Sequence, residues 1–451
     1  MDRELFEGLP EVAAPKRPRG GRPRLRRPER GQVRLEALSL DDLVPAGHRV
    51  RQVWAFAEGL DLGPLYARIK AVEGHPGHPP ADPRMVLALW LFATVEGVGS
   101  ARALVRLCRE HHAYRWLCGG VSVNHKTLSD FRVGHGALLE RLLIDGYAAL
   151  LKAGVARLER VAQDGVRVRA SAGAASFRRL STLRRCREAA AERLRRLRRE
   201  LDEDPGAAQR RRAAAQCRAA EDRARRVGEA LAAAEALASA RLAWRDGGQR
   251  READGSGPPA SPGGREPRAS TTDPEARVMK MADGGWRPAY NAQFATDTES
   301  GLIVGVAVDN RGSDMGKLRP MSEQLARDYG LRPPEHLADG GFAKLADVAA
   351  LAAAGVAVYA PVPKPRDPER ERYAPLPGDP PGVAAWRQRM GTEAAKAIYK
   401  RRAASAEWTN AQARNRGLQR LPVRGLAKVK AVLLWFALAH NMACGWRLTP
   451  A

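Results

Sequence analysis

The sequence predicts an α/β protein in which a mixed sheet follows a helical domain and is interrupted by a long helical insertion. Three observations lead to this class. Short β-like runs alternate with helix-like stretches after residue 276. Residues 41–155 have a helical pattern, and residues 176–245 consist almost entirely of strong helix formers. At 451 residues the chain exceeds what one hydrophobic core usually organises, so we expect two or three domains.

The chain opens with a basic arm, assigned to residues 1–40. Its segment 15–31, PKRPRGGRPRLRRPERG, is rich in Arg, Pro and Gly and cannot bury much apolar surface, so we expect it to be disordered. Such an arm adds affinity for DNA that does not depend on base sequence. The alternative is a tail that only keeps the protein in solution.

Two further features indicate a cytoplasmic, soluble protein without a membrane partner. The amino terminus, MDRELFEGLPEV, lacks the apolar stretch of a signal peptide. The apolar runs at 86–95 and 431–439 are too short to cross a bilayer.

Cap residues mark the helix starts in the helical domain, assigned to residues 41–155. Asp82 and Pro83 open the helix MVLALWLFATVEG, and Ser100 caps ARALVRLCREHH. Asn124 is expected to cap a helix over residues 124–132. If this is a recognition helix that binds DNA, Lys126 and Arg132 face the DNA. Any amphipathic helix after a loop has the same pattern, so a packing helix is the alternative.

The insertion, assigned to residues 176–275, is predicted to be a helical hairpin followed by a loop. The segment DEDPG at 202–206 has the composition of the hairpin turn. Leu194, Leu197 and Leu201 recur at helical spacing and form one thin apolar stripe. Residues 246–275 are rich in Gly, Pro and Ser and indicate a loop. The hairpin is either a solvated antiparallel pair or a basic clamp on DNA.

Residues 156–175 and 276–447 are assigned to one α/β domain. VAQDGVRVRA provides a strand before the insertion, and YNAQFATD and LIVGVAVDN follow as two strands joined by a turn at 298–301. HLADGG and VAVYAP are two further short strands, and LAKVKAVLLWFALAHNMACGW is a final apolar helix. The other helices are expected at residues 314–329, 342–354 and 384–416. This order fits a ribonuclease H-like mixed sheet with the hairpin inserted after its first strand.

Charge and cysteine content narrow the function. The formal net charge of +25 favours nucleic acid as a partner, bound by neutralising its phosphates; a solvated basic surface is the alternative. The five cysteines are scattered and form no CxxC pair, which suits neither a disulfide framework nor a zinc site. A reducing compartment follows.

Three acidic residues lie in three unlike settings. Asp164 lies in the first strand, Asp339 ends a short strand before Gly-Gly, and Glu407 lies in a helix rich in Arg and Ala. They converge only if the chain folds them together, and they would then form an oxygen-only site of the kind that holds Mg²⁺ against phosphates. Asp297, Asp309 and Asp314 also lie near strand ends and are interpreted as turn or cap residues.

Two divalent ions about 3.5–4 Å apart activate the oxygen nucleophile and shield the departing oxygen when a phosphodiester is cleaved or transferred. Three carboxylates are enough to hold them when one bridges both ions. We assign the bridging role to Asp164, one ion to Asp339 and the other to Glu407.

Several blocks of the sequence resemble bacterial insertion-sequence transposases of the Asp-Asp-Glu (DDE) class, and the resemblance covers nearly the whole chain. HPPADPRMVLALWLFATVEGVGSARALVRLCREHHAYRWLCGG and NHKTLSDFR are similar to the amino-terminal domain of that family. QDGVRVRASA resembles the first catalytic block and ADGGF the second, while TTDPEARVMK and PAYNAQFATD resemble the blocks between them.

The third block of the family runs Tyr, two residues, Arg, several residues, Glu, six residues, Lys. Tyr399 and Arg402 fit it, but four residues separate Arg402 from Glu407 where many relatives have three. Arg414 stands in place of the Lys and keeps a positive charge that can grip a phosphate. If the altered spacing shifted the ligand, Glu393 would be the nearest alternative.

Two more residues of this block are candidates for contact with bases. Asn410 and Trp408 could reach frayed bases, with a core position as the alternative for Trp408.

The resemblance implies cleavage at terminal inverted repeats and strand transfer into target DNA, by a homodimer or larger assembly at the nucleoid. The implied catalytic and metal-binding residues are Asp164, Asp339 and Glu407, with two Mg²⁺ ions and Mn²⁺ as a substitute. Tyr399, Arg402 and Arg414 would contact transposon-end DNA. The alternatives are a metal-dependent nuclease without strand transfer and a non-catalytic DNA-binding protein derived from a transposase.

Overall fold

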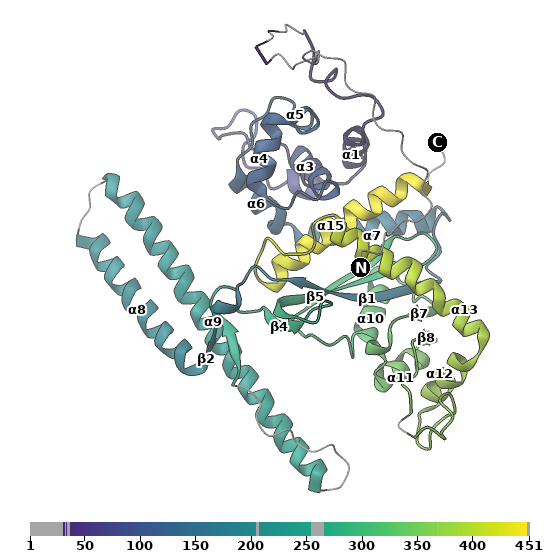
Figure 1. Ribbon diagram of the computed structural model, residues 1–451. Helices are drawn as coiled ribbons and strands as arrows, with labels where there is room; N and C mark the ends of the chain where they lie inside the picture. The colour runs from purple at the N-terminus through teal and green to yellow at the C-terminus, as the bar shows by residue number, and fades with distance from the viewer. Residues whose placement is uncertain are drawn as a thin grey trace, which may run out of the picture. The chain divides into compact units, whose positions relative to one another are not determined.

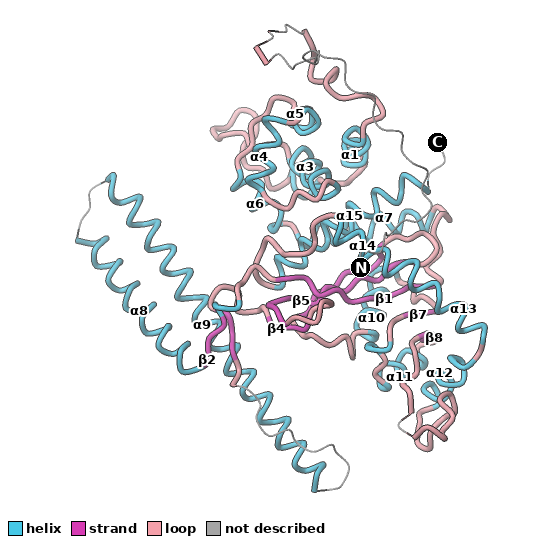
Figure 2. Tube along the Cα trace, in the orientation of Figure 1, coloured by secondary structure: helices cyan, strands magenta, loops and turns pink. Residues whose placement is uncertain are grey.

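The computed structural model describes residues 37–203, 207–253, 266–365 and 367–448, together with Arg30, Gly31 and Val33. Most of the predicted basic arm, the tip of the predicted hairpin turn and the middle of the predicted loop lie outside the described residues. Figures 1 and 2 show how the helices and strands are arranged.

A mixed sheet organises the α/β part of the chain, with β1 (Arg160–Arg169) at its centre. On one side β1 pairs antiparallel with β5 (Trp286–Asp297) over nine residue pairs. On the other it pairs parallel with β7 (Glu335–Leu337), over three pairs from Arg160↔Glu335 to Ala162↔Leu337. The strand that carries Asp164 is therefore the one strand that joins the two halves of the sheet.

The outer strands complete the order β4-β5-β1-β7-β8 (Figure 1), and β6 also pairs with β5. β8 (Ala357–Tyr359) continues parallel to β7. β6 (Ile303–Asp309) and β4 (Arg277–Lys280) pair antiparallel with opposite ends of β5. β4, β5, β6 and β1 thus pair antiparallel, whereas β7 and β8 run parallel to β1, as expected for a mixed sheet. The predicted turn at 298–301 joins β5 to β6, and the buried side chain of Asp297 accepts from the backbone N–H of Ser300 at 3.2 Å.

The amino-terminal helices begin at the caps that the sequence predicts. The side chain of Asp82 accepts from Arg84 N, that of Ser100 from Ala103 N and that of Asn124 from Thr127 N. The helices of this part are α1 (Arg49–Glu58), α2 (Gly63–Tyr66), α3 (Pro83–Val95), α4 (Ala101–Glu110), α5 (His112–Cys118), α6 (His125–Gly134) and α7 (Gly136–Lys152).

The helical hairpin forms as predicted, and α8 (Leu180–Glu203) and α9 (Ala207–Ala253) lie side by side (Figure 2). The leucine stripe is confirmed, because Leu194, Leu197 and Leu201 pack with Cys217 and Ala220. The predicted loop at 246–275 is partly wrong. α9 continues to residue 253, since adding a residue to a formed helix costs little, and residues 268–270 form a strand.

Two short strands close the base of the hairpin. β2 (Phe177–Arg179) leads into α8, and β3 (Arg268–Ser270) follows the insertion. They pair antiparallel, and the hydroxyl groups of Ser176 and Ser270 lie 2.7 Å apart beside them. The entry and the exit of the insertion therefore meet at one point.

The remaining helices match the expected order with shifted ends. They are η1 (Ala174–Ser176), α10 (Leu318–Tyr329), η2 (Gly340–Phe342), α11 (Leu345–Ala353), α12 (Pro381–Gly391), α13 (Glu393–Arg402), the π-helical turn η3 (Ala403–Glu407), α14 (Trp408–Asn415) and α15 (Leu426–Leu448). The late start of α10 has a local cause. Asp314, in the segment before it, accepts hydrogen bonds from β5 instead of joining the helix.

The apolar helix α15 packs in the core. Its residues 426–446 are long and apolar enough to cross a membrane by length and composition, but 61% of that window is buried within the protein. Trp435, Phe436 and Leu438 lie in the main hydrophobic cluster with α3 and with Phe294 of the sheet. The indole N–H of Trp435 donates to the carbonyl of Arg132, which ties α15 to α6. These contacts are those of a core helix.

A buried polar chain crosses the other side of the sheet. His336 is fully buried on β7, and its Nε2 lies 3.0 Å from Oε1 of Gln163 on β1. The amide of Gln163 donates to Gln293 on β5, and Gln293 donates to Asp314 at 2.7 Å. Burial lowers the pKa of His336 to about 4, so this ring is neutral in the folded protein at neutral pH.

The buried His336 predicts a loss of stability in mild acid. Between about pH 6.5 and pH 4 the His336 ring binds a proton in the unfolded chain but not in the folded chain, so the free energy of unfolding falls as the pH falls. The gap in pKa corresponds to about 3 kcal/mol. Urea unfolding across this range should show that His336→Asn, which cannot take up the proton, loses about 3 kcal/mol less than the wild type. Parallel curves for the two proteins would contradict the assignment.

Candidate carboxylate site

Asp164 lies on the central strand, and both oxygens of its carboxylate accept hydrogen bonds. Alternation along β1 places it on the face opposite Gln163 and Gly165. Its Oδ1 accepts from the backbone N–H of Gly165 at 2.9 Å, and its Oδ2 accepts from the side-chain amide of Asn410 at 2.9 Å. The guanidinium of Arg402 lies 3.6 Å from the same Oδ2.

The charge balance around Asp164 is unfavourable to its ionised form. Burial raises the pKa of the carboxyl, the Arg402 guanidinium opposes this, and the charges of Asp339 and Asp314 raise the pKa further. Several carboxylates therefore act on one another here, and a bound cation would relieve their repulsion.

Asp339 is brought level with Asp164 by the pairing of their strands. The parallel register ends at Ala162↔Leu337, and each aspartate lies two residues beyond that pair. Asp339 follows the carboxyl end of β7, where its Oδ1 accepts from the N–H of Gly341 at 2.8 Å and caps the short helix η2. Open α/β sheets place their functional groups at this edge.

Glu407 is connected to Asp164 by an ion pair with Arg402. Its carboxylate is 59% exposed at the end of η3, and Oε1 lies 3.3 Å from Nη2 of Arg402. Since Arg402 also contacts Asp164, one guanidinium connects the first and third predicted carboxylates. The three carboxylates are not packed together. Within the described parts of the chain, no three acidic, His or Cys side chains are close enough to form a ready metal cluster.

The π-helical turn accounts for the unusual spacing before Glu407. An α-helix brings residues four apart onto one face, whereas a π turn does so for residues five apart. Arg402 and Glu407 are five apart and span this turn, and their side chains meet. The extra residue is thus absorbed within the helix, and Arg402 keeps its place beside Glu407. Glu393 offers no substitute here, because it starts α13, is 88% exposed and pairs with Lys396 at 2.8 Å.

The groups around Asp164 suit a divalent cation. The available donors are oxygens, as Mg²⁺ prefers, and the side-chain oxygen of Asn410 is buried without a hydrogen-bond partner among the described residues. Nη1 of Arg402 is likewise buried without a hydrogen bond in the described structure. The free oxygen of Asn410 marks a place where a cation would be stabilising, whereas Nη1 of Arg402 already forms an ion pair with Asp164.

The predicted DNA-contacting residues of the third block remain near the carboxylates. Tyr399 is half-buried, and the guanidinium of Arg402 lies 5.8 Å from the centre of its ring. Arg414 is exposed on α14. Trp408 is half-buried and packs edge-on against His440 of α15, with ring centres 5.0 Å apart, so the core alternative describes it better than a base contact.

The two residues predicted to face DNA from α6 differ in position. Lys126 is exposed and pairs with Asp130 one turn away, at 2.7 Å. Arg132 is only 7% exposed, and its guanidinium stacks on Trp90 at 4.7 Å. Burial lowers the pKa of Arg132 to about 10. The structure therefore places Arg132 in the core, where it cannot meet DNA, and α6 packs between α3 and α15 through this residue.

The structure gives two residues near the site a role that the sequence did not indicate. Asp314, interpreted as a turn or cap residue, accepts from the side chains of Asn291 and Gln293 and lies 3.4 Å from Arg167. Gly165 permits this, because a Cβ at that position would collide with the Asp314 carboxylate. The Asp-Gly pair in the first block was the available signal, but the partner of the glycine lies far away in the sequence.

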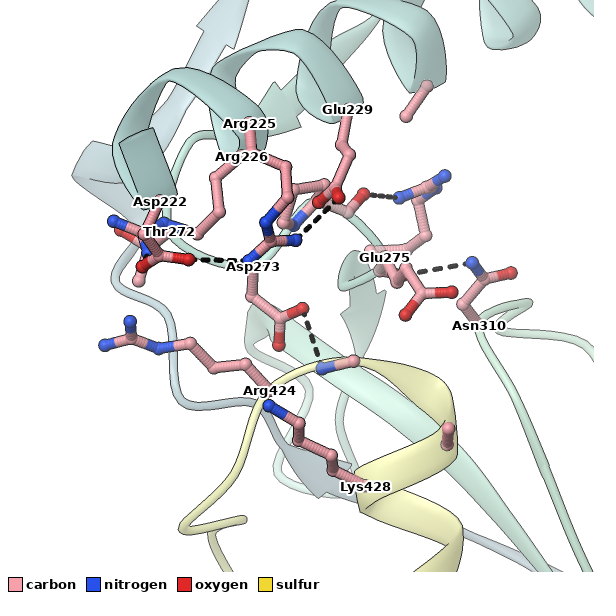
Figure 3. A pocket seen from close by; sticks show the side chains of 15 residues that line it. Asp222, Arg225, Arg226, Glu229, Thr272, Asp273, Glu275, Asn310, Arg424 and Lys428 are labelled. Atoms are coloured by element: carbon pink, nitrogen blue, oxygen red, sulfur yellow. Dashed lines mark hydrogen bonds and ion pairs between the residues drawn. The ribbon is translucent and has the colours of Figure 1, made fainter. Parts of the chain in front are cut away.

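A separate cavity of about 680 Å³ lies where α9 meets the start of α15 (Figure 3). Asp273 is fully buried beside it and accepts from the hydroxyl of Tyr290 and the N–H of Gly425. Glu275 accepts from Leu426 N, so the two acids cap α15. The lining residues from α9 are Asp222, Arg225, Arg226, Glu229 and Ala233.

Comparison with protein families matches two segments of this chain. Residues 38–134 match a family described as a transposase domain (DUF772), and residues 261–442 match the transposase DDE domain. Asp339 and Glu407 lie within the second segment, whereas Asp164 lies outside both. Neither the curated proteins nor the solved structures gave a match.

The two matched segments together cover more than half of the chain, and they fall on the helical part and on the α/β part of the fold. The mixed α/β domain and the helical domain before it thus belong to a transposase. More closely, the chain belongs to the insertion-sequence transposases of the DDE class, as the sequence resemblance implied.

The π turn predicts an unequal response to two deletions. Removing Ala404 should turn η3 into regular α-helix, leave Arg402 and Glu407 on one face and change the melting temperature by less than about 4 °C. Removing Ala411 from α14 should lower it by more than about 8 °C, since every later residue turns by about 100° and Ala413 leaves the core. Thermal unfolding followed by circular dichroism measures both. An equal fall in melting temperature for the two deletions would show that no residue of η3 can be removed without disturbing the helix.

Proposed function

We propose that this transposase cleaves DNA strands at the terminal inverted repeats of its element and joins the ends to target DNA. The observation that carries the proposal is the alignment of Asp164 on β1 with Asp339 just past the end of the paired strand β7, with Glu407 linked to Asp164 through Arg402. The match to the transposase DDE domain supports the reaction class.

We also propose that the catalytic domain is ribonuclease H-like. Its support is the strand order β4-β5-β1-β7-β8, with three antiparallel strands followed by two parallel ones. The domain limits assigned from the sequence, 156–175 with 276–447 around the insertion 176–275, belong to the same proposal.

In the proposed mechanism, Asp164, Asp339 and Glu407 would hold two Mg²⁺ ions, or Mn²⁺ in their place. When bound, the ions supply an activated oxygen nucleophile and stabilise the departing oxygen. Arg402 contacts both Asp164 and Glu407, and its guanidinium would bind a phosphate of the DNA end when it no longer pairs with them. Arg414 and Tyr399 would contact the same DNA from α13 and α14.

The hairpin provides a second DNA contact in this proposal. Arg226 of α9 lies close enough to Arg424 for the charge of Arg424 to lower its pKa, after the larger effect of burial. Both guanidinium groups line one cavity, in which Arg226 already pairs with Asp222, and a DNA phosphate beside Arg424 would add a further negative partner. Exposed Lys428 lines the same cavity (Figure 3). This favours the basic clamp over the purely solvated hairpin.

A homodimer or larger assembly would hold the two ends of the element, and the protein would act in the cytoplasm at the nucleoid.

Cleavage of labelled DNA that carries the ends of the element tests the reaction. With Mg²⁺ or Mn²⁺ the wild type should nick at the repeat boundary, whereas Asp164→Asn should bind the DNA without nicking it. Joining of the cleaved ends to a second DNA molecule separates a transposase from a nuclease. Binding without cleavage by both proteins, with either metal, would support the non-catalytic alternative.

Salt-dependent DNA binding tests the role of the hairpin. The double variant Arg226→Ala/Arg424→Ala should bind DNA more weakly, whatever the base sequence of the DNA. The slope of log affinity against log salt concentration should fall by about 2, since two phosphate contacts are lost. Arg332→Ala, exposed in the turn after α10, serves as the control and should keep the wild-type slope. An unchanged slope in the double variant would favour the solvated hairpin.

A further inference from the structure

Asn410 occupies an unusual place for an amide side chain. It lies on α14, three residues after Glu407, so the two side chains share one face of the helix. It is only 6% exposed. Its Nδ2 donates to Asp164 at 2.9 Å, and its Oδ1 is buried with no hydrogen-bond partner among the described residues.

Burial of this amide has a cost that packing alone does not offset. A buried acceptor without a partner costs about 1–3 kcal/mol, and Asn is also a poor residue for a helix interior. Neighbouring Thr409, by contrast, is satisfied, since its hydroxyl donates to the carbonyl of Ser405. The unsatisfied oxygen thus belongs to the side chain that donates a hydrogen bond to Asp164.

Arg402 lies beside the same carboxylate as the positive partner of Asp164, with Nη1 3.6 Å from Oδ2. A metal cation in its place would be next to the carboxylate of Asp164, and the hydrogen-bonded Asn410 would bring its free oxygen to the same carboxylate. Neutral amide oxygens are ordinary ligands for hard divalent cations.

On the basis of the proposed function, we propose that Asn410 is a further residue of the metal site. Its N–H holds Asp164 in place, and its Oδ1 supplies an additional oxygen to the divalent ion. This assignment replaces the expectation that Asn410 reaches a base, because a side chain buried in this way is not presented to DNA.

An amide suits both tasks better than the alternatives of similar size. Aspartate at 410 offers oxygen but no N–H for Asp164, and alanine offers neither group. The two variants therefore separate the oxygen from the donor.

The experiment is a calorimetric titration of the full-length protein with MnCl₂ in the absence of DNA. Asn410→Ala should weaken Mn²⁺ binding by about 10–100-fold. Asn410→Asp keeps an oxygen at the same place and should bind Mn²⁺ within about threefold of the wild type. Asn415→Ala, on the exposed side of the same helix, is the matched control and should bind as the wild type does.

DNA affinity in EDTA is measured for the same proteins, and a base contact would lower it in Asn410→Ala. Wild-type Mn²⁺ affinity in Asn410→Ala would overturn the inference, whatever its effect on DNA. If Asn410→Ala fails to fold, Asn410→Asp decides: affinity within threefold of the wild type supports the oxygen role, and a loss of tenfold or more overturns it.

Asp164→Asn distinguishes failure of this inference from failure of the proposed function. If it loses Mn²⁺ binding while Asn410→Ala keeps it, only the role of Asn410 is wrong. If it binds Mn²⁺ as the wild type does, the carboxylate site itself is wrong, and the proposed function falls with the inference.

Discussion

The parallel pairing of β1 with β7 is the constraint on which the candidate site depends. It involves only three residue pairs, yet it sets Asp164 within β1 level with Asp339, which follows the end of β7. Each aspartate lies two residues beyond the last pair, so a one-residue slip would separate Asp164 from Asp339 and turn one of them to the opposite face. The buried contact between His336 and Gln163 lies within this short ladder and helps to set its register.

Local features of the sequence were sufficient for much of the fold. Caps at Asp82, Ser100 and Asn124 act within one helical turn, and the leucine stripe of the hairpin depends on simple periodicity. The order of strands and helices followed from the same signals. The candidate carboxylates were selected by their settings and by the family resemblance, and the structure adds how Asp164 and Asp339 are aligned.

What the sequence could not predict depends on distant partners. Arg132 has the pattern of an exposed helix residue, and only the packing of Trp90 and Trp435 around α6 shows that it is buried. The strand β3 has no periodic signal of its own and exists because β2 pairs with it. The π turn needs a comparison of spacing with geometry, because four intervening residues alone do not say whether Glu407 moves or the helix adapts.

The small ribbon formed by β2 and β3 has a consequence for how this chain tolerates change. Because the insertion leaves and rejoins the core at one paired stem, its length is independent of the distance between the sheet strands on either side. Helical turns can be gained or lost at the far end of α8 and α9 while the stem stays closed. The hairpin is thus a part whose length can change without disturbing the strands that carry the carboxylates.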